Sequence, residues 1–252
     1  MPASATTHIV IDFGNTLKKI AVFHDEELAS LQTFRSKEFR RVERYLLSLP
    51  RGSSCIISSV IDYPPHFSAT LKGCFNTVFL THETPIPLRI SYATPQTLGK
   101  DRIAAAVAAW HMFPHKNLLV IDAGTAITLD FVSQHGEYLG GSISPGIDLR
   151  FKALHYFTGH LPLILRKNIR FLTGSSTQES ILSGVINGTV AEIDGTIDQY
   201  RRLHPDLITI LGGGDAKFLH KRLKNSIFAL PNLTLSGLNI ILRYNIENAH
   251  QH

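Results

Sequence analysis

Short apolar runs that end at polar or glycine residues fill the first part of the chain. Runs of this length favour β-strands, because helices need longer periodic segments. Residues 40–49 differ: Val42, Tyr45, Leu46 and Leu49 recur at a spacing that places them on one face of a helix. The strands expected in this part are residues 9–11, 17–23, 28–34, 54–60 and 76–80.

Helical segments and short strands alternate through the rest of the chain. Residues 99–112 are rich in alanine and are followed by Pro114, so a helix is expected there. Upstream, Pro64 and Pro65 are expected to break the chain. The further expectations are strands at residues 118–121, 126–132 and 207–211, helices at residues 147–157, 177–203 and 216–224, and a glycine-rich connection at residues 136–146.

One short phrase appears twice, each time after an apolar strand and before another. It reads VIDFGNT at residues 10–16 and VIDAGTA at residues 120–126, 110 residues apart (120 minus 10). Each half therefore opens alike, which predicts an internal duplication with domains at residues 1–113 and 114–252. Two similar domains facing each other would make a cleft, and such clefts are favoured ligand sites.

The repeated phrase has a composition that suits phosphate chemistry. A strand fixes the aspartate carboxylate at a sheet edge, and glycine permits a tight reversal and a close approach to a ligand. Turn N–H groups and the next polar side chain suit phosphate oxygens and a hydrated cation. A single Asp-x-Gly is most often a plain turn, whereas two copies and a glycine-rich turn at residues 211–215 favour a site. There is no GxxxxGK[ST] motif, so this is no P-loop kinase.

The expected long helix carries Gly184, Gly188 and Gly195 along one stripe. A stripe of glycines implies that another helix approaches closely. That helix could belong to the same domain or to a second subunit.

The amino-acid composition narrows the class of protein that the chain can be. The chain has 252 residues, 44% of them hydrophobic, and a net charge of +5 whose basic residues are scattered. Nucleic-acid binding is therefore not expected, and a mild positive balance suits anionic substrates. Cys55 and Cys74 form no zinc or redox motif, and no apolar run approaches the ~20 residues that span a bilayer. A reduced, cytoplasmic protein without a membrane partner is expected.

The order of these motifs resembles the superfamily of actin, the heat-shock chaperones and the sugar kinases, and most closely the type III pantothenate kinases. The matching stretches cover nearly the whole chain: DFGNT at residues 12–16, LGKDR at 98–102, DAGTA at 122–126 with Thr128 and Asp130, GGSISPG at 140–146, Thr177, Asn187-Gly188 and Gly212-Gly213. Gly-x-Asp-Arg is the most discriminating. The resemblance implies an α/β fold of two duplicated ribonuclease-H-like domains, the actin-like ATPase fold, with an interdomain cleft.

The resemblance also implies an activity. The enzyme would be a phosphotransferase with an alcohol acceptor, using ATP to convert pantothenate to 4'-phosphopantothenate in the first step of coenzyme A biosynthesis. ATP with Mg²⁺, and a monovalent cation, K⁺ or NH₄⁺, would be required. The protein would be a homodimer.

Site residues carry over by position from the family. Asp101 would be the catalytic base, and Asp122 would bind the monovalent cation. Asp12 would hold Mg²⁺ through water. Substrate-binding residues would be Tyr92, Gly99, Lys100, Asp101, Arg102 and Thr177. ATP-binding residues would be Asp12, Phe13, Gly14, Asn15, Thr16, Leu17, Lys18, Lys19 and Thr125.

Several of these residues have a simpler interpretation. Asp101 could merely cap a helix, Arg102 could form a surface ion pair, and Tyr92 could be packing. Thr177 follows Ser176 in a possible capping box. Lys18 and its neighbour point to opposite faces of a strand, so at least one of them is expected to be only solvated.

Two rival functions remain open at this point. One is another small-molecule kinase of the same superfamily, against which the Gly-Lys-Asp-Arg segment argues. The other is a non-catalytic regulator, which should have lost Asp12, Asp101 or Asp122, and all three are present. Leu211 stands where the family often has threonine, which puts a polar contact to the nucleotide there in doubt.

Overall fold

The computed structural model describes residues 6–35 and 37–249, and it divides into two compact units. Unit 1 comprises residues 1–112, 136–138 and 232–252, and unit 2 comprises residues 113–135 and 139–231. The assignment of two duplicated domains at residues 1–113 and 114–252 stays a prediction.

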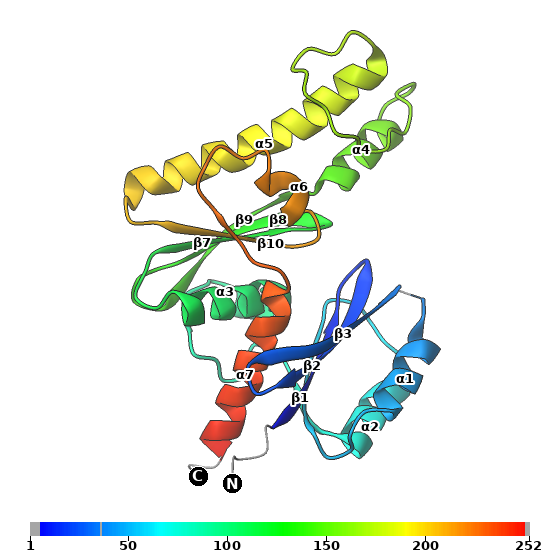
Figure 1. The fold of residues 1–252 in the computed structure, drawn as a ribbon, viewed down its shortest axis with the longest axis vertical. Coiled ribbons are helices and arrows are strands. Elements are labelled where there is room, and N and C mark those ends of the chain that lie inside the picture. Colours follow the sequence, from blue (N-terminus) through cyan, green and yellow to red (C-terminus); the bar gives the residue numbers. More distant parts are fainter. Residues whose placement is uncertain (1–5, 36, 250–252) are drawn as a thin grey trace. The chain divides into compact units, whose positions relative to one another are not determined.

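Unit 1 is built on a five-stranded sheet in the order β3-β2-β1-β4-β5 (Figure 1). Its central strand, β1, is antiparallel to β2 and parallel to β4. The strands are β1 (Thr7–Phe13), β2 (Leu17–His24), β3 (Glu27–Arg35), β4 (Ser54–Ser59) and β5 (Asn76–Phe79). All five were expected from the sequence, with ends shifted by one or two residues.

Helices cover both faces of this sheet. On one face, α1 (Phe39–Leu47) and α2 (Pro65–Cys74) share an apolar core with alternate residues of β1 and β4. On the other, α7 (Leu233–Ala249) contacts β1 and β4 and packs on α3 (Lys100–Met112). A Cβ at Gly237 would lie 1.7 Å from the Ala104 carbonyl oxygen, so only glycine lets these two helix backbones approach so closely.

Unit 2 repeats this sheet order. Its strands run β9-β8-β7-β10-β11, with β7 antiparallel to β8 and parallel to β10. The strands are β7 (Leu118–Ala123), β8 (Ala126–Val132), β9 (Glu137–Pro145), β10 (Ile208–Gly212) and β11 (Phe228–Ala229). In unit 1, β6 (Arg89–Ile90) pairs with Glu137 and Tyr138, the first residues of β9.

Three helices pack on the sheet of unit 2. Apolar side chains of β7 and β8 share a core with α4 (Ile147–Tyr156), α5 (Thr177–Leu203) and α6 (Ala216–His220). The bounds expected for α5 are confirmed. Among the described residues no helix is long and apolar enough to cross a membrane.

Three expectations from the sequence were wrong. The glycine-rich stretch 136–146 is strand β9, since backbone pairing tolerates glycine: Gly140 has φ 104°, and a Cβ at Gly141 would lie 1.8 Å from the Leu129 carbonyl oxygen. Pro65 does not break the chain but begins α2, a position where its missing N–H costs nothing. The helix expected at residues 216–224 ends at His220.

Candidate active site

The first copy of the repeated phrase forms an exposed turn at the end of β1. The Gly14 N–H donates to the Leu17 carbonyl at 3.0 Å, which closes the reversal into β2. Asn15 and Thr16 are exposed, and Asp12 is half-buried at the strand end. Lys19 pairs with Asp12 across the two strands. A carboxylate, a cation and exposed turn residues therefore lie together where a phosphate could bind.

Lys18 and Lys19 lie on opposite faces of β2, as the sequence predicts. Lys18 is fully buried. Its ammonium lies 4.1 Å from the centroid of the Phe39 ring and 5.7 Å from that of Phe13. Burial lowers the pKa of Lys18, and the charge of Glu38 opposes that shift. Lys18 therefore points into the aromatic core, while Lys19 shares the face of Asp12.

The Gly-Lys-Asp-Arg segment begins α3. Asp101 is half-buried in the first turn, and its Oδ1 accepts a hydrogen bond from the Arg102 N–H at 2.9 Å. A Cβ at Gly99 would lie only 2.6 Å from that same oxygen. Glycine at position 99 therefore leaves room for the carboxylate. Arg102 is 6% exposed, which argues against a surface ion pair.

Lys100 reaches from α3 to the end of β4. Its ammonium donates to the Ser59 carbonyl at 3.4 Å. It lines a cavity of about 750 Å³ together with Asp62, Tyr63 and Thr81, from the segments that follow β4 and β5. The cavity lies at the carboxyl ends of these strands, where open α/β sheets commonly bind ligands.

Tyr92 is half-buried, and its ring meets that of Tyr138 edge to face, 6.1 Å between centroids. This contact supports the packing interpretation of Tyr92 and leaves part of the ring accessible.

The second copy of the phrase forms a turn held from two sides. The Gly124 N–H closes the turn on the Ala126 carbonyl at 2.9 Å, and the Gly146 N–H donates to the Thr125 carbonyl at 3.0 Å. Gly213 has φ 94°, and a Cβ there would lie 2.4 Å from Asp122 Oδ1. The Asp122 carboxylate thus packs directly against the glycine turn that follows β10, and Thr125 is exposed beside it.

An unpaired hydroxyl lies opposite Asp122. Thr128 on β8 pairs with Asp122 across the strands, and its buried Oγ1 has no hydrogen-bond partner among the described residues. A carboxylate and a hydroxyl are hard oxygen donors of the kind that K⁺ would accept. In the described chain no group of three or more His, Cys, Asp and Glu side chains could hold a metal ion, so a site here would need carbonyl oxygens, water or ligand as well.

Thr177 lies in a different setting, at the start of α5. Ser176 caps the helix by accepting from the Glu179 N–H at 3.2 Å, and the Glu179 carboxylate accepts from the Ser175 N–H at 2.8 Å. The hydrogen bonds from Ser175 lower the pKa of Glu179. The capping interpretation holds for Ser176, whereas the Thr177 hydroxyl remains exposed.

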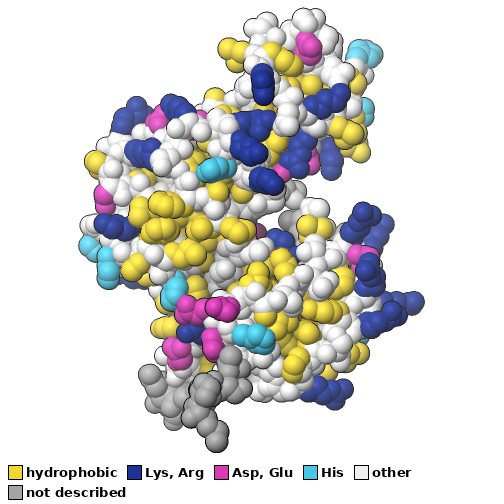
Figure 2. Space-filling view, in the orientation of Figure 1, with side chains coloured by type: hydrophobic (Ala, Val, Ile, Leu, Met, Phe, Trp, Pro, Cys, Tyr) yellow, Lys and Arg dark blue, Asp and Glu magenta, His cyan; other side chains and the backbone are white. Residues whose placement is uncertain are grey.

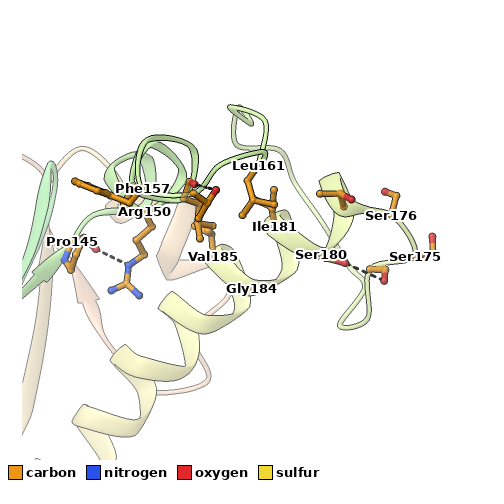
Figure 3. Close-up of a pocket in the computed structure, with 15 residues that line it drawn as sticks. Pro145, Arg150, Phe157, Leu161, Ser175, Ser176, Ser180, Ile181, Gly184 and Val185 are labelled. Carbon is orange, nitrogen blue, oxygen red and sulfur yellow. Dashed lines mark hydrogen bonds between the residues drawn. The ribbon is translucent and has the colours of Figure 1, made fainter.

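Thr177 lines a cavity of about 1120 Å³ between α4 and α5 (Figure 3). Phe157, Leu161 and Ile181 give it an apolar wall, and the Arg150 side chain donates to the Pro145 carbonyl at 2.8 Å, drawn dashed in the figure. Apart from Thr177, no residue of the predicted site lines this cavity.

Within unit 1 the structure brings the Asp12 turn and the start of α3 to the same end of the sheet. The Val60 N–H donates to the Phe13 carbonyl at 3.0 Å, and Lys100 bonds the neighbouring Ser59. Within unit 2 it brings together Asp122, Thr125 and the turn at Gly213. The family motif that contains Thr128 implies no role for it, but the antiparallel register of β7 and β8 places it opposite Asp122.

Comparisons with known proteins agree on one family. A family profile described as type III pantothenate kinase matches residues 8–199. The type III pantothenate kinase of Flavobacterium johnsoniae is 44% identical over 241 residues, 95% of this chain and 99% of the relative. That of Christiangramia forsetii is 46% identical over 239 residues, 94% of this chain and 98% of the relative.

Solved structures share the fold at low identity. A Campylobacter jejuni protein assigned to the Baf family of transcriptional activators has a TM-score of 0.62 at 22% identity, covering 95% of this chain and 99% of that one. An Arthrobacter polyphosphate/ATP-glucomannokinase has a TM-score of 0.50 at 13% identity, covering 98% and 100%. These likenesses confirm the two-sheet, actin-like α/β fold class. The family profile and the curated relatives establish that the chain belongs to the type III pantothenate kinase family.

Proposed function

We propose that the protein transfers the γ-phosphoryl group of ATP to the hydroxyl of pantothenate, forming 4'-phosphopantothenate and ADP in the first step of coenzyme A biosynthesis. The main support for this proposal is the arrangement of residues at the start of α3. There Asp101 is half-exposed, held by the Arg102 N–H and given room by Gly99, in the segment most specific to the family. The reaction would take place in the cytoplasm, with no nucleic acid or membrane as partner.

Asp101 acts in this proposal as the base. The Arg102 N–H donates to its carboxylate in the first turn of α3, where a negative charge interacts favourably with the helix dipole. Phosphoryl transfer passes through a loose transition state, in which positioning and charge neutralisation dominate. Asp101 orients the pantothenate hydroxyl and accepts its proton late, as the bond to phosphorus forms and the bond to ADP breaks.

Arg102 binds the pantothenate carboxylate, using a planar guanidinium that can donate two parallel hydrogen bonds. Tyr92 and Thr177 contact the rest of the acceptor. The turn at residues 12–17, with Lys19 and Thr125, binds ATP, whereas the Lys18 side chain is buried in the aromatic core and does not contact it.

Two cations complete the proposal. Asp12 would hold Mg²⁺ through water, and Asp122 with Thr128 would hold K⁺ or NH₄⁺. Bound cations neutralise phosphate charge as it develops. The residues fit these tasks because Asp12 is accessible beside an exposed turn, and because Asp122 faces a hydroxyl that lacks a protein partner.

The protein is proposed to act as a homodimer through α5 and its surroundings. A Cβ at Gly184, Gly188 or Gly195 would meet nothing within 4 Å, so no described part of the chain packs on this stripe. Nearby, Tyr156 is 77% and Phe157 89% exposed. Figure 2 shows hydrophobic side chains gathered among Lys and Arg side chains over α4 and the segment after it. Exposed apolar patches of this kind mark interaction surfaces.

The test is ADP release from the purified protein with ATP, Mg²⁺ and K⁺, with and without pantothenate, beside Asp101→Asn. We expect pantothenate-dependent release that falls at least about 100-fold in the variant, the range of general base catalysis. Binding of ATP to the variant should be retained, which calorimetry would check.

Two outcomes would contradict the proposal. Wild-type turnover by Asp101→Asn would remove Asp101 from the mechanism. A wild-type protein that binds ATP but releases no ADP with pantothenate would require a different acceptor, to be sought among sugars and short carboxylic acids.

A further inference from the structure

Three buried hydroxyl oxygens have no hydrogen-bond partner in the described part of the chain: those of Ser58, Thr128 and Thr209. A buried donor left unpaired costs free energy, and each such group calls for an explanation. Ser58 is the most deeply buried of the three, with no exposed surface at all.

Strand register places Ser58 beside Asp12. The two residues are partners in the parallel pairing of β1 and β4. Cys55 and Ile57 on β4, like Ile11 and Phe13 on β1, belong to the core under α1 and α2. Because side chains alternate along a strand, Ser58 and Asp12 share the opposite face.

The same end of β4 meets the start of α3. Lys100 donates to the carbonyl of Ser59, the residue after Ser58. The Val60 N–H continues the pairing of β4 with β1 by donating to Phe13. Ser58 therefore lies beside Asp12, at the end of the sheet where the Asp12 turn and the start of α3 come together within unit 1.

We propose that Ser58 is a positioning residue for Asp12: its hydroxyl donates a hydrogen bond to the Asp12 carboxylate when Mg·ATP is bound. Ser58 is too deeply buried to touch a substrate, but neighbouring parallel strands bring its hydroxyl within reach of the carboxylate. The hydrogen bond would fix one carboxylate oxygen and leave the other available to a hydrated Mg²⁺. This inference rests on the proposed role of Asp12 and adds a residue to which the family resemblance gives no role.

The test is the binding of a non-hydrolysable ATP analogue by calorimetry at several Mg²⁺ concentrations, with the melting temperature recorded alongside. In Ser58→Ala we expect the Kd and the half-saturating Mg²⁺ concentration to rise about tenfold, the effect of one hydrogen bond to a charged group. The KM for pantothenate should not change. The melting temperature should stay level or rise.

Thr209→Val is the matched control. It removes another unpartnered buried hydroxyl, one whose strand partner is Leu119 rather than an aspartate. Its Kd should stay within about twofold of wild type, as for an ordinary substitution without a ligand. A Kd in Ser58→Ala equal to that of this control would overturn the proposal.

A double-mutant cycle separates positioning from a general structural effect. In an Asp12→Asn background, Ser58→Ala should weaken nucleotide binding by no more than about twofold, because groups that act through each other are not additive. Full additivity would contradict the proposal. If Ser58→Ala does not fold, Ser58→Cys replaces it in the test. Because a thiol donates weakly, a Kd about threefold above that of wild type would support the proposal. A Kd equal to that of wild type would contradict the proposal.

The nucleotide-binding and melting measurements need no acceptor; only the KM for pantothenate does. Failure of pantothenate as a substrate would therefore leave their result unaffected. A wild-type protein that binds no Mg·ATP would remove the proposed function, and with it the role of Ser58.

Discussion

The two copies of the phrase stand on the same scaffold but have different neighbours. In both units the aspartate ends a central strand that has an antiparallel hairpin partner on one side and a parallel strand on the other. Beside Asp12, the hairpin partner is Lys19 and the parallel partner is Ser58. Beside Asp122, the hairpin partner is Thr128 and the parallel partner is Gly212.

This difference separates two electrostatic tasks. The Asp12 turn has a positively charged strand partner in Lys19. Such a turn could bind an anion, or a cation that keeps its water shell. The strand partners of Asp122 are a threonine and a glycine, neither of which carries a charge. A carboxylate beside a hydroxyl oxygen offers two oxygen donors to a cation. The two units thus share a strand arrangement and differ in the residues beside each aspartate.

Replacing Gly213, which packs against Asp122, should cost far more stability than replacing Gly14 in the Asp12 turn. Gly213 has φ 94°, and a Cβ would lie 2.2 Å from the Ala123 carbonyl oxygen, whereas a Cβ at Gly14 would lie 3.3 Å from that of Leu17. We expect Gly213→Ala to cost about 3 kcal/mol or more, through strain and a backbone clash. Gly14→Ala should cost less than about 1 kcal/mol. Urea denaturation measures both, and equal losses would contradict this difference between the turns.

The sequence predicted most strands, the long helix and the place of each aspartate, because these follow from local periodicity and turn chemistry. It could not predict that β9 is a strand, since what fixes Gly141 is its contact with the backbone of Leu129. It also could not predict the role of Gly237, which depends on α3 and α7 packing on each other although they are far apart in sequence. Contacts between distant segments decide such positions.

The candidate site was predictable to a similar degree. Family motifs named Asp101 and Arg102, but only the structure reveals that Gly99 makes room for the Asp101 carboxylate. The doublet at residues 18 and 19 was correctly expected to split between two faces. Only the structure reveals which of the two lysines faces the core, because it places the Lys18 ammonium over the Phe39 ring. Ser58 gave no signal in the sequence, because a serine within a strand is common.

The two aspartates should also differ in how they affect the dependence of the rate on monovalent cations. If Asp122 and Thr128 hold K⁺, the wild-type enzyme should turn over about tenfold faster in K⁺ than in Na⁺, an effect of roughly 1.4 kcal/mol. Asp122→Asn should be slow in both, and Thr128→Val should keep part of the preference. Steady-state rates and the binding of Tl⁺ as a K⁺ substitute would measure this.

The control for the cation site comes from the other unit. Asp12→Asn should lower the rate in both cations without changing their ratio. A ratio that follows Asp12 instead of Asp122 would reverse the assignment of the two copies.

The smallest effect is expected for the KM for ATP when Lys18 or Lys19 is replaced. Lys19→Met should raise the KM for ATP about threefold, in the range of an exposed charge contact, and Lys18→Met should leave it unchanged. Lys18→Met should instead stabilise the fold at neutral pH, because burial lowers the pKa of Lys18 below its value in the unfolded chain.

The sign of the pH dependence follows from that shift. Between the folded pKa and about 10.4, the unfolded chain binds more protons than the folded one, so the wild type gains stability as pH rises through this window. The advantage of Lys18→Met over wild type should therefore shrink toward pH 10.4, in denaturation curves recorded from neutral to alkaline pH. An advantage that grows with pH, or an ATP KM that rises in Lys18→Met but not in Lys19→Met, would mean that the buried lysine is the one that binds phosphate.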